Sequence, residues 1–174
     1  MGLIFGNFGA TINLVMKTLI AYYSRSGSNK KLAQEIKEKL NCEIEEIIDT
    51  VNRKGFLGFI VGGFHASSKK KTKIQPIQKN PANYDLIIII TPLWAEVVSP
   101  AIRTYISENK DKFKKIAFIS VSGSGEPNAK KTMPDLMALA GKEDILNLFL
   151  SQKEFKKENY TDKLERFLEK IKTV

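Results

Sequence analysis

The amino-acid sequence predicts an α/β protein of three layers, in which a doubly wound, five-stranded parallel sheet lies between two layers of helices. Short apolar runs alternate with amphipathic helical patterns along the chain, as in successive βαβ units. The most apolar run, Leu-Ile-Ile-Ile-Ile at residues 86–90, is typical of a central parallel strand that is covered on both faces. With 174 residues, of which 43% are hydrophobic, the chain is long enough for one domain with a substantial core.

The first half of the chain contains two expected strands and one expected helix. The apolar run Leu-Ile-Ala indicates a strand over Lys17–Tyr23. A helix over Ser28–Leu40 is expected next, because apolar side chains recur on one face at residues 32, 33, 36 and 40. A second strand is expected over Cys42–Asp49. The apolar, glycine-rich segment 55–65, which ends at His65, is interpreted either as a helix packed on the sheet or as a flap over a ligand.

The second half continues the alternation of strand and helix. Its expected elements are, in order, the strand Leu86–Thr91, the helix Pro100–Asn109, the strand Ile116–Val121, a helix that ends near Ala140, the strand Ile145–Leu150 and a closing helix. Ser99 is a typical N-cap residue, and Pro100 suits the first helical position. The closing helix carries apolar residues at positions 164, 167, 168 and 171, which follow i, i+3, i+4 and i+7 spacing.

The turn after the first strand, residues 24–29, has the composition of an anion-binding loop. The backbone N–H groups of a first helical turn have no partner inside the helix, and the helix dipole adds partial positive charge there. Three hydroxyls and one amide can donate to a ligand, those of Ser24, Ser26, Ser28 and Asn29. The loop lacks the lysine of a P-loop and the G-x-G-x-x-G of dinucleotide-binding loops. It is predicted to hold a phosphate, although serine-rich turns also cap helices without binding any ligand.

Two further loops follow expected strands and are rich in hydrogen-bonding groups. The loop after residues 86–90 holds the only tryptophan of the chain, Trp94. The loop at residues 122–128 follows the strand Ile116–Val121 and is rich in serine and glycine. In open α/β sheets, ligands bind outside the carboxyl ends of the strands. The three loops are therefore predicted to form one site.

On these motifs the chain resembles the flavodoxin-like family of short-chain, FMN-binding electron-transfer proteins, over residues 16–174. The family's phosphate loop carries a Ser/Thr-x-Thr/Ser-Gly pattern, whose counterpart here is formed by Ser24, Arg25, Ser26, Gly27, Ser28 and Asn29. Its second loop often reads Thr-Pro-x-Trp and lies against the isoalloxazine ring, with the counterpart Thr91, Pro92, Leu93 and Trp94. Its third loop reaches the pyrimidine edge of the ring, with the counterpart Ser122, Gly123, Ser124 and Gly125.

The resemblance implies the strand order 2-1-3-4-5 and a noncovalently bound FMN as the cofactor. It implies a single FMN-binding domain over residues 16–174, which leaves residues 1–15 as an N-terminal extension whose role the sequence does not indicate. No residue is an evident general acid or base. No catalytic side chain is therefore expected, since the flavin itself would carry the redox chemistry.

Electron transfer through the bound flavin is the expected function. The alternative is an FMN-dependent NAD(P)H or quinone oxidoreductase, and a third interpretation is a cofactor-free interaction module of the same fold. Flavodoxins are strongly acidic, whereas this chain has 28 Lys and Arg against 19 Asp and Glu, a net charge of +9. The excess lysines form either a solvated surface without a specific role or a basic rim that steers a partner toward the flavin, for which an acidic, ferredoxin-like redox protein or anionic NAD(P)H is expected. Whether the protein is a carrier or an enzyme stays open, as does its oligomeric state.

Several other functions are not expected from the composition. The chain has one cysteine and one histidine, so neither a disulfide framework nor a metal site is expected. Nucleic-acid binding is not expected either, because no aromatic residues are interleaved with the lysines. Residues 1–15 are uncharged, lack the basic start of a secretory signal and are shorter than a bilayer span. A cytoplasmic protein without stable membrane insertion is therefore expected.

Overall fold

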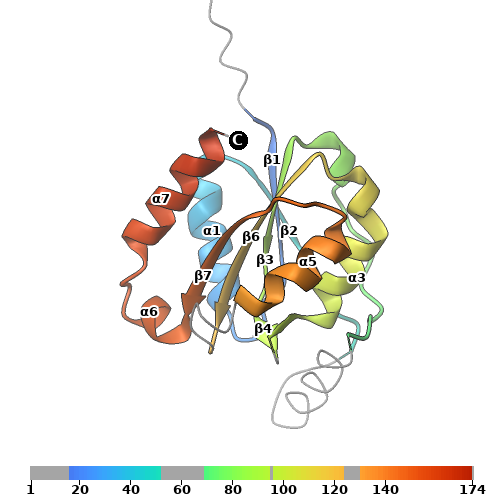
Figure 1. Ribbon diagram of the computed structural model, residues 1–174, viewed down its shortest axis with the longest axis horizontal. Helices are drawn as coiled ribbons and strands as arrows, with labels where there is room; N and C mark the ends of the chain where they lie inside the picture. Colours follow the sequence, from blue (N-terminus) through green and yellow to red (C-terminus); the bar gives the residue numbers. More distant parts are fainter. Residues whose placement is uncertain (1–15, 52–68, 95, 124–129, 174) are drawn as a thin grey trace, which may run out of the picture.

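The computed structural model describes residues 16–51, 69–94, 96–123 and 130–173. Its centre is a five-stranded sheet of order β2-β1-β3-β6-β7, in which every neighbouring pair is parallel (Figure 1). The strands are β1 (Thr18–Tyr22), β2 (Glu43–Glu46), β3 (Leu86–Ile90), β6 (Lys115–Ser122) and β7 (Leu146–Ser151). Because β6 and β7 are the fourth and fifth strands of this sheet in chain order, the predicted order 2-1-3-4-5 is confirmed.

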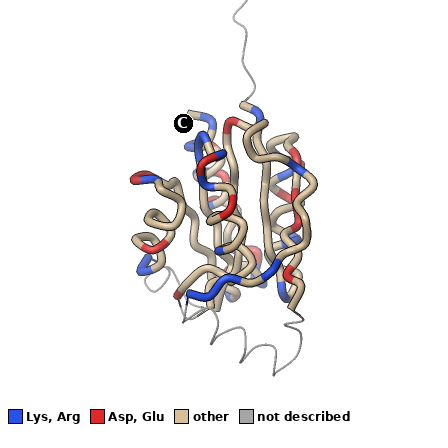
Figure 2. The backbone as a smooth tube through the Cα atoms, turned by 90° about the vertical axis from the view of Figure 1, so that its right-hand side faces the viewer, with Lys and Arg blue, Asp and Glu red and all other residues tan. Residues whose placement is uncertain are grey.

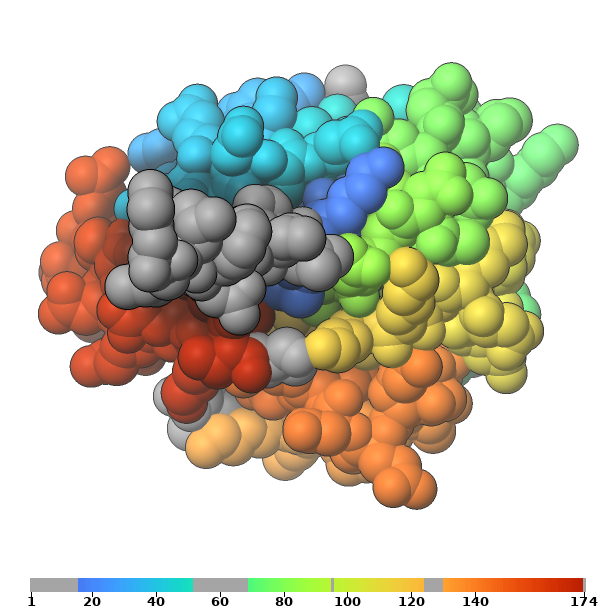
Figure 3. Space-filling model, turned by 90° about the horizontal axis from the view of Figure 1, so that it is seen from above, coloured from blue at the N-terminus to red at the C-terminus, as the bar shows by residue number. Residues whose placement is uncertain are grey.

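Helices cover both faces of the sheet and complete the three predicted layers. One face carries α1 (Ser28–Leu40), α6 (Gln152–Lys156) and α7 (Thr161–Lys172), and the other carries α3 (Pro100–Asn109) and α5 (Met133–Ala140). Seen from above, α1 and α7 lie on one side of the molecule and α3 and α5 on the other (Figure 3). Three short 3-10 helices are η1 (Pro81–Asn83), η2 (Lys110–Lys112) and η3 (Lys130–Thr132).

The helices α1 and α3 have the predicted bounds, because the sequence marks their ends. Gly27 precedes α1 with φ 93°, and Asn41 follows it with φ 46°, so both flanking residues are left-handed. Glycine adopts this conformation freely, and asparagine tolerates it better than most residues do. Pro100 occupies the first turn of α3. Gly141 ends α5 in the same left-handed way, with φ 64°.

Three features of the fold differ from the sequence-based expectation. The strand β2 ends at Glu46 and is therefore shorter than the predicted Cys42–Asp49. Beyond it the chain leaves β1, and Asp49 forms an antiparallel bridge with Ile74. A two-stranded hairpin, β4 (Leu93–Trp94) and β5 (Val97–Val98), and the helix α6 were not predicted. The strands β4 and β5 and the helix α6 are each too short to show a hydrophobic period in the sequence. The apolar segment 55–65 with His65 and the extension 1–15 lie outside the described residues.

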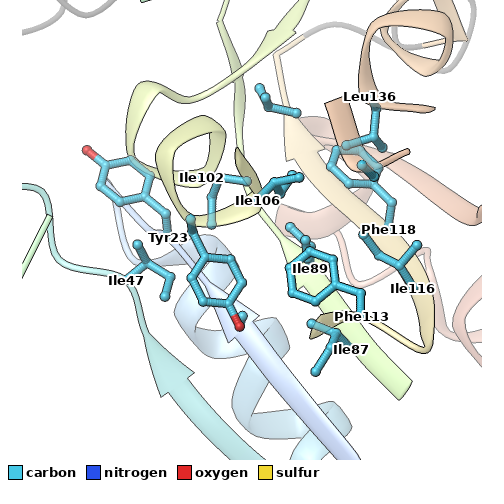
Figure 4. Packing of buried hydrophobic residues seen from close by; sticks show 14 of the residues in the cluster. Tyr23, Ile47, Ile87, Ile89, Ile102, Ile106, Phe113, Ile116, Phe118 and Leu136 are labelled. Carbon is cyan, nitrogen blue, oxygen red and sulfur yellow. The ribbon is translucent and has the colours of Figure 1, made fainter. Parts of the chain in front are cut away.

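The core consists of two apolar layers, one on each side of the sheet. Side chains alternate between the faces of a strand, so Leu19 and Ala21 face α3 and α5 whereas Ile20 and Tyr22 face α1 and α7. All five residues of β3 are buried, as expected for a central strand. Figure 4 shows the layer between the sheet and α3, where strand and helix side chains interdigitate.

The short helix α6 is held by a capping box at its first turn. The Ser151 hydroxyl accepts a hydrogen bond from the Glu154 backbone N–H at 3.1 Å, and the Glu154 carboxylate accepts one from the Ser151 backbone N–H at 2.8 Å. Lys163 of α7 donates to the same carboxylate at 2.6 Å. The Lys163 ammonium, followed by the Ser151 amide and hydroxyl, lowers the pKa of Glu154 from 4.5 to about 2.

We expect this carboxylate to make the stability of the protein depend on pH. Since the pKa of Glu154 is depressed in the folded state, its contribution is present above pH 4.5 and is lost as the pH falls toward 2. Glu154→Gln should lower the free energy of unfolding at pH 7 by about 1 kcal/mol, with a difference that shrinks over that acidic range. Urea unfolding at several pH values measures this, with the exposed Glu143→Gln as a control that should change little. A pH-independent difference would contradict the role of the charge.

Candidate functional site

The described residues that follow β1 and β3 lie together at the carboxyl end of the sheet, the lower end in Figure 1, where β6 also ends. Two contacts illustrate this. The Asn29 Oδ1 atom, at the start of α1, accepts a hydrogen bond from the backbone N–H of Val121 in β6 at 3.2 Å. The rings of Tyr23 and Trp94 meet edge to face, with their centroids 5.8 Å apart. The structure therefore brings together the first two of the predicted loops and the end of β6, after which the third loop begins.

The first turn of α1 presents unpaired backbone amides to the site. The first helical hydrogen bond runs from Lys31 N–H to Gly27 C=O at 2.9 Å. The preceding N–H groups, those of Ser28, Asn29 and Lys30, have no acceptor within the described part of the chain. Such amides, together with the helix dipole, favour an anion at this position.

The side chains of this loop divide into structural and exposed ones. Ser24 accepts the Gly27 N–H at 3.1 Å, and Ser28 donates to Gln152 at 3.3 Å. Asn29 is 3% exposed, and its carbonyl oxygen holds α1 on the sheet. Arg25 and Ser26 are exposed, as is Gly27. The ligand contacts predicted for this loop remain predictions. The groups that the structure leaves most accessible to a ligand are the backbone N–H groups of the first turn of α1 and the Ser26 side chain.

The loop after β3 is closed by a buried pair of hydroxyls. Thr91 is fully buried, and its Oγ1 lies 2.9 Å from the Ser99 Oγ atom at the other end of the loop. Ser99 is the N-cap residue of α3 as predicted, but its hydroxyl makes no capping bond and meets Thr91 instead. Leu93 is 7% exposed and belongs to the core, whereas Pro92 is partly exposed. The contact between Thr91 and Ser99 thus fixes the ends of the loop, between which Pro92 and Trp94 are partly exposed.

Trp94 belongs to the hairpin of β4 and β5, which is anchored on the side of α5. Its turn residue Glu96 is left-handed, with φ 63°, and its backbone carbonyl accepts a hydrogen bond from the Thr132 hydroxyl. Lys131 lies 3.6 Å from the Glu96 carboxylate. Thr132 is buried, so this contact anchors the hairpin to the segment before α5. Trp94 itself is half-buried and leans on Tyr23.

Sequence reasoning missed both Tyr23 and Thr132 as parts of this region. Tyr23 could have been found, because it is the last apolar residue before the serine-rich turn. Thr132 has no such signal, since its partner Glu96 is 36 residues away in the chain.

The loop after β6 is described only in part. Ser122 is buried, and Gly123 is exposed, with no atom within 4 Å of the position that a Cβ would occupy. Ser124 and Gly125, the other two candidates of this loop, lie outside the described residues. Space next to Gly123 therefore adjoins the site on the β6 side.

A lysine segment is anchored at the same end of the sheet. Lys69 lies 2.9 Å from the Asp135 carboxylate in the first turn of α5, and the buried Arg103 pairs with the same group. Although burial raises the pKa of Asp135, the hydrogen bonds from Arg103 and then Lys69 hold that pKa below its usual value. Thr72 and Thr104 also exchange two hydrogen bonds, of 3.0 and 2.7 Å. Figure 2 shows this basic run at the lower end of the molecule.

The described residues hold no group of three or more His, Cys, Asp or Glu arranged for a metal ion. No described helix is both long and apolar enough to cross a membrane.

Comparison with known proteins gives a family match and a set of similar folds. The profile of a family described as NADPH-dependent FMN reductase matches residues 16–141. A flavoprotein from Lactobacillus acidophilus NCFM, solved in complex with FMN, superposes with TM-score 0.64 at 22% identity, over 84% of this chain and 99% of its own. Comparison with curated protein sequences gave no match.

Two further solved structures share the fold. A WrbA-like flavodoxin from Agrobacterium tumefaciens has TM-score 0.51 at 18% identity, over 75% of each chain. An NADH:FMN oxidoreductase in its apo form has TM-score 0.54 at 11% identity, over 90% of this chain and 89% of its own. At these identities the superpositions establish the fold alone.

The backbone conformation at Gly27 provides a test of the anion-binding turn. Gly27→Ala should raise the dissociation constant of FMN about tenfold, because a side chain is strained at φ 93° and the turn must shift. Gly141→Ala is the matched control, since φ there is 64° and space is equally open. It should lower stability while leaving FMN affinity unchanged. Fluorescence titration of the apoprotein measures both, and equal FMN affinities in the two variants would contradict the assignment.

The aromatic pair provides a second test. Trp94→Ala should weaken FMN and riboflavin alike, by about fivefold, because it removes an aromatic contact that does not involve the phosphate. Ser26→Ala should weaken FMN and spare riboflavin, since its hydroxyl is exposed beside the α1 amides. Titration of each variant with both flavins separates the two effects. The assignment of Trp94 fails if its loss affects FMN only.

Proposed function

The chain belongs to the NADPH-dependent FMN reductase family, and on this basis we propose that it is an FMN-dependent oxidoreductase that uses NAD(P)H to reduce an acceptor. The family is flavodoxin-like, so the predicted family and the predicted cofactor, FMN, are confirmed. Of the functions that the sequence left open, the NAD(P)H or quinone oxidoreductase therefore has better support than the electron carrier. A cofactor-free interaction module has the least.

The family match carries the choice of an oxidoreductase, and the structural observation that supports FMN binding is the set of unpaired amides at the start of α1. These N–H groups, of Ser28, Asn29 and Lys30, suit a phosphate monoester, with Ser26 and Arg25 exposed beside them. Gly27 allows the close turn that aims them outward. The donor set fits FMN, whose phosphate ends a flexible chain.

The second and third loops would hold the flavin ring. Trp94 and Pro92 are the partly exposed residues of the second loop, with Thr91 and Leu93 buried behind them. The edge-to-face contact with Tyr23 holds Trp94 in one orientation. On the β6 side, the open space at Gly123 lets a planar ring approach the backbone closely. We propose residues 16–174 as the FMN-binding domain.

Bound FMN would supply the two-electron chemistry, which takes a hydride from NAD(P)H and passes two electrons and protons to the acceptor. The side chains of this chain position the reactants. Cys42 lies in the apolar layer around α1, where burial raises the pKa of its thiol to about 11 and keeps it protonated. It is therefore no nucleophile at neutral pH, and it lies before β2, at the end of the sheet opposite the predicted site.

The charge at the carboxyl end suits an anionic nucleotide. Lys71 and Lys73 follow the anchored Lys69, and Lys131 lies at the hairpin turn. These ammonium groups would attract the phosphates of NAD(P)H toward the flavin end and raise the association rate. A small anionic donor needs no dedicated docking surface, whereas a protein donor does. The acidic redox protein expected from the composition thus becomes the second choice of partner.

Reduction of the bound flavin by NADPH is the direct test. The FMN-loaded protein should lose its absorbance near about 450 nm within seconds of anaerobic mixing with NADPH, and a quinone should restore that absorbance. Lys71→Gln with Lys73→Gln should raise the KM for NADPH several-fold and leave kcat unchanged, because only attraction and binding are weakened.

A control variant makes the same change of charge on the far side of the molecule. Lys37→Gln with Lys172→Gln should leave the KM unchanged, since these exposed residues lie in the last turns of α1 and α7, at the end of the sheet opposite the loops of the site. If NADPH and NADH both fail to bleach the flavin, while a reduced redox protein does so, the electron carrier replaces the oxidoreductase.

A further inference from the structure

The strand β7 is an edge of the sheet whose backbone is open. It pairs with β6 only. At the other edge, the segment after β2 is accompanied by residues 74–78, with Gln75 N–H donating to Ile48 C=O at 2.9 Å and Gln78 N–H to the Glu45 carboxylate at 2.8 Å. Along residues 146–150, no group in the described ranges other than β6 bonds to the backbone. The outward N–H and C=O groups of β7 are thus available to another strand.

A groove runs along this open edge between β7 and α7, with a volume of about 220 Å³. Its floor is Leu146–Phe149, and its wall includes Lys163, Arg166 and Lys170 of α7. Their i, i+3 and i+7 spacing places the three basic side chains on one face of the helix. A second hollow of about 220 Å³ meets the groove at Leu146. Its charged lining is Lys114, Lys115, Lys142 and Asp144.

The groove carries an excess of positive charge. Lys163 is neutralised by Glu154 at 2.6 Å, and Lys114 is paired with Asp85 at 2.9 Å. By contrast, the side chains of Arg166, Lys170 and Lys142 have no carboxylate partner among the residues that the structure describes. The acidic residue of the lining, Asp144, offsets only part of this charge.

The strand itself lacks the features that usually protect an edge. Its sequence Leu-Asn-Leu-Phe-Leu at residues 146–150 contains neither proline nor a charged residue, and its pairing with β6 has no bulge. The charge next to this edge comes instead from α7, whose basic side chains repel a cationic strand and attract an acidic one. The charge of a strand therefore decides whether it can pair with β7.

We propose that the β7 edge binds an extended acidic peptide segment of a partner protein by strand addition. The backbone of the segment pairs with the outward groups of Leu146–Leu150, and its carboxylates lie against Arg166, Lys170 and Lys142. Backbone pairing supplies affinity in this mode of recognition, and side chains on alternate positions supply specificity. The site lies on the side of the sheet away from β2 and is separate from the flavin loops (Figure 1).

The same observations disfavour the other occupants. Phe149 and Phe167 in the groove are 5% and 4% exposed, so no aromatic face is available on which nucleic-acid bases could stack. A second copy could offer its own acidic edge β2. That contact would be head to tail, however, and residues 74–78 already accompany that edge.

The proposal is tested with the FMN-loaded full chain and a fluorescent eight-residue peptide of alternating glutamate and valine. Fluorescence anisotropy should show saturable binding, and hydrogen exchange should slow at the amides of residues 146–150. A peptide of alternating lysine and valine should not bind. N-methylation of alternate backbone amides of the acidic peptide should abolish binding, because the methyl groups block strand pairing while the charge is unchanged.

Charge reversal locates the site on the protein. Arg166→Glu with Lys170→Glu should weaken the acidic peptide at least about tenfold. The control Lys157→Glu with Lys172→Glu makes the same change of net charge outside the groove and should have less than about a twofold effect. Flavin content should be unchanged in both variants, which shows that they are folded.

Three outcomes would overturn the proposal. Absence of saturable binding excludes the acidic peptide as an occupant. Equal binding of the N-methylated peptide would show attraction to the basic surface without strand addition. If, in the absence of peptide, the amides of residues 146–150 become more protected from hydrogen exchange as the protein concentration rises, the edge is assigned to a second copy of this chain.

Discussion

The buried central strand β3 is the constraint on which the rest of the structure depends. Its five aliphatic residues must be covered on both faces, which requires β1 and β6 alongside and helices above and below. Parallel neighbours can be joined only by crossovers, and these are right-handed. The carboxyl ends of all five strands consequently lie at the same end of the sheet, and the described helices α1, α3, α5 and α6 follow from there. The convergence of the three loops is thus a consequence of burying β3.

Within the site, buried polar side chains hold the loops, and exposed groups are left for ligands. Asn29 bonds to the backbone of β6, Thr91 to Ser99, and Thr132 to the turn at Glu96. Each of these contacts joins segments that are distant in the chain or closes a loop on itself. Buried hydrogen bonds of this kind cost stability when they are left unmade, so they restrict each loop to one conformation. Under the proposed function, the preorganised amides at the start of α1 would receive a phosphate without rearrangement.

The net charge of +9 is distributed over regions with different roles. Lys69 is bound to Asp135 and acts as an anchor between the lysine segment and α5. Lys30 and Lys39 pair with glutamates at the surface, where such pairs contribute little to stability. Further basic residues lie in the segment that begins at Lys69 and along the groove at β7. A single value of net charge therefore does not identify a partner, because the charge is spread over separate surfaces.

The sequence by itself determined the layers of this protein and the five strands of its sheet, and it predicted a site at the carboxyl ends of the strands. The layers and strands depend on local signals, namely the aliphatic run of β3, Gly27 and Asn41 around α1, and Pro100 in α3. Which of the described candidate side chains are buried and which are exposed was decided by the tertiary structure. Thr91 and Asn29 belong to motifs that predict ligand contacts, yet both side chains are engaged in the protein interior. The hairpin that carries Trp94 is held by Thr132, and the open edge of β7 arises from strand order. A local pattern encodes periodicity and turns, whereas pairing between residues far apart in the chain is settled only when the layers pack.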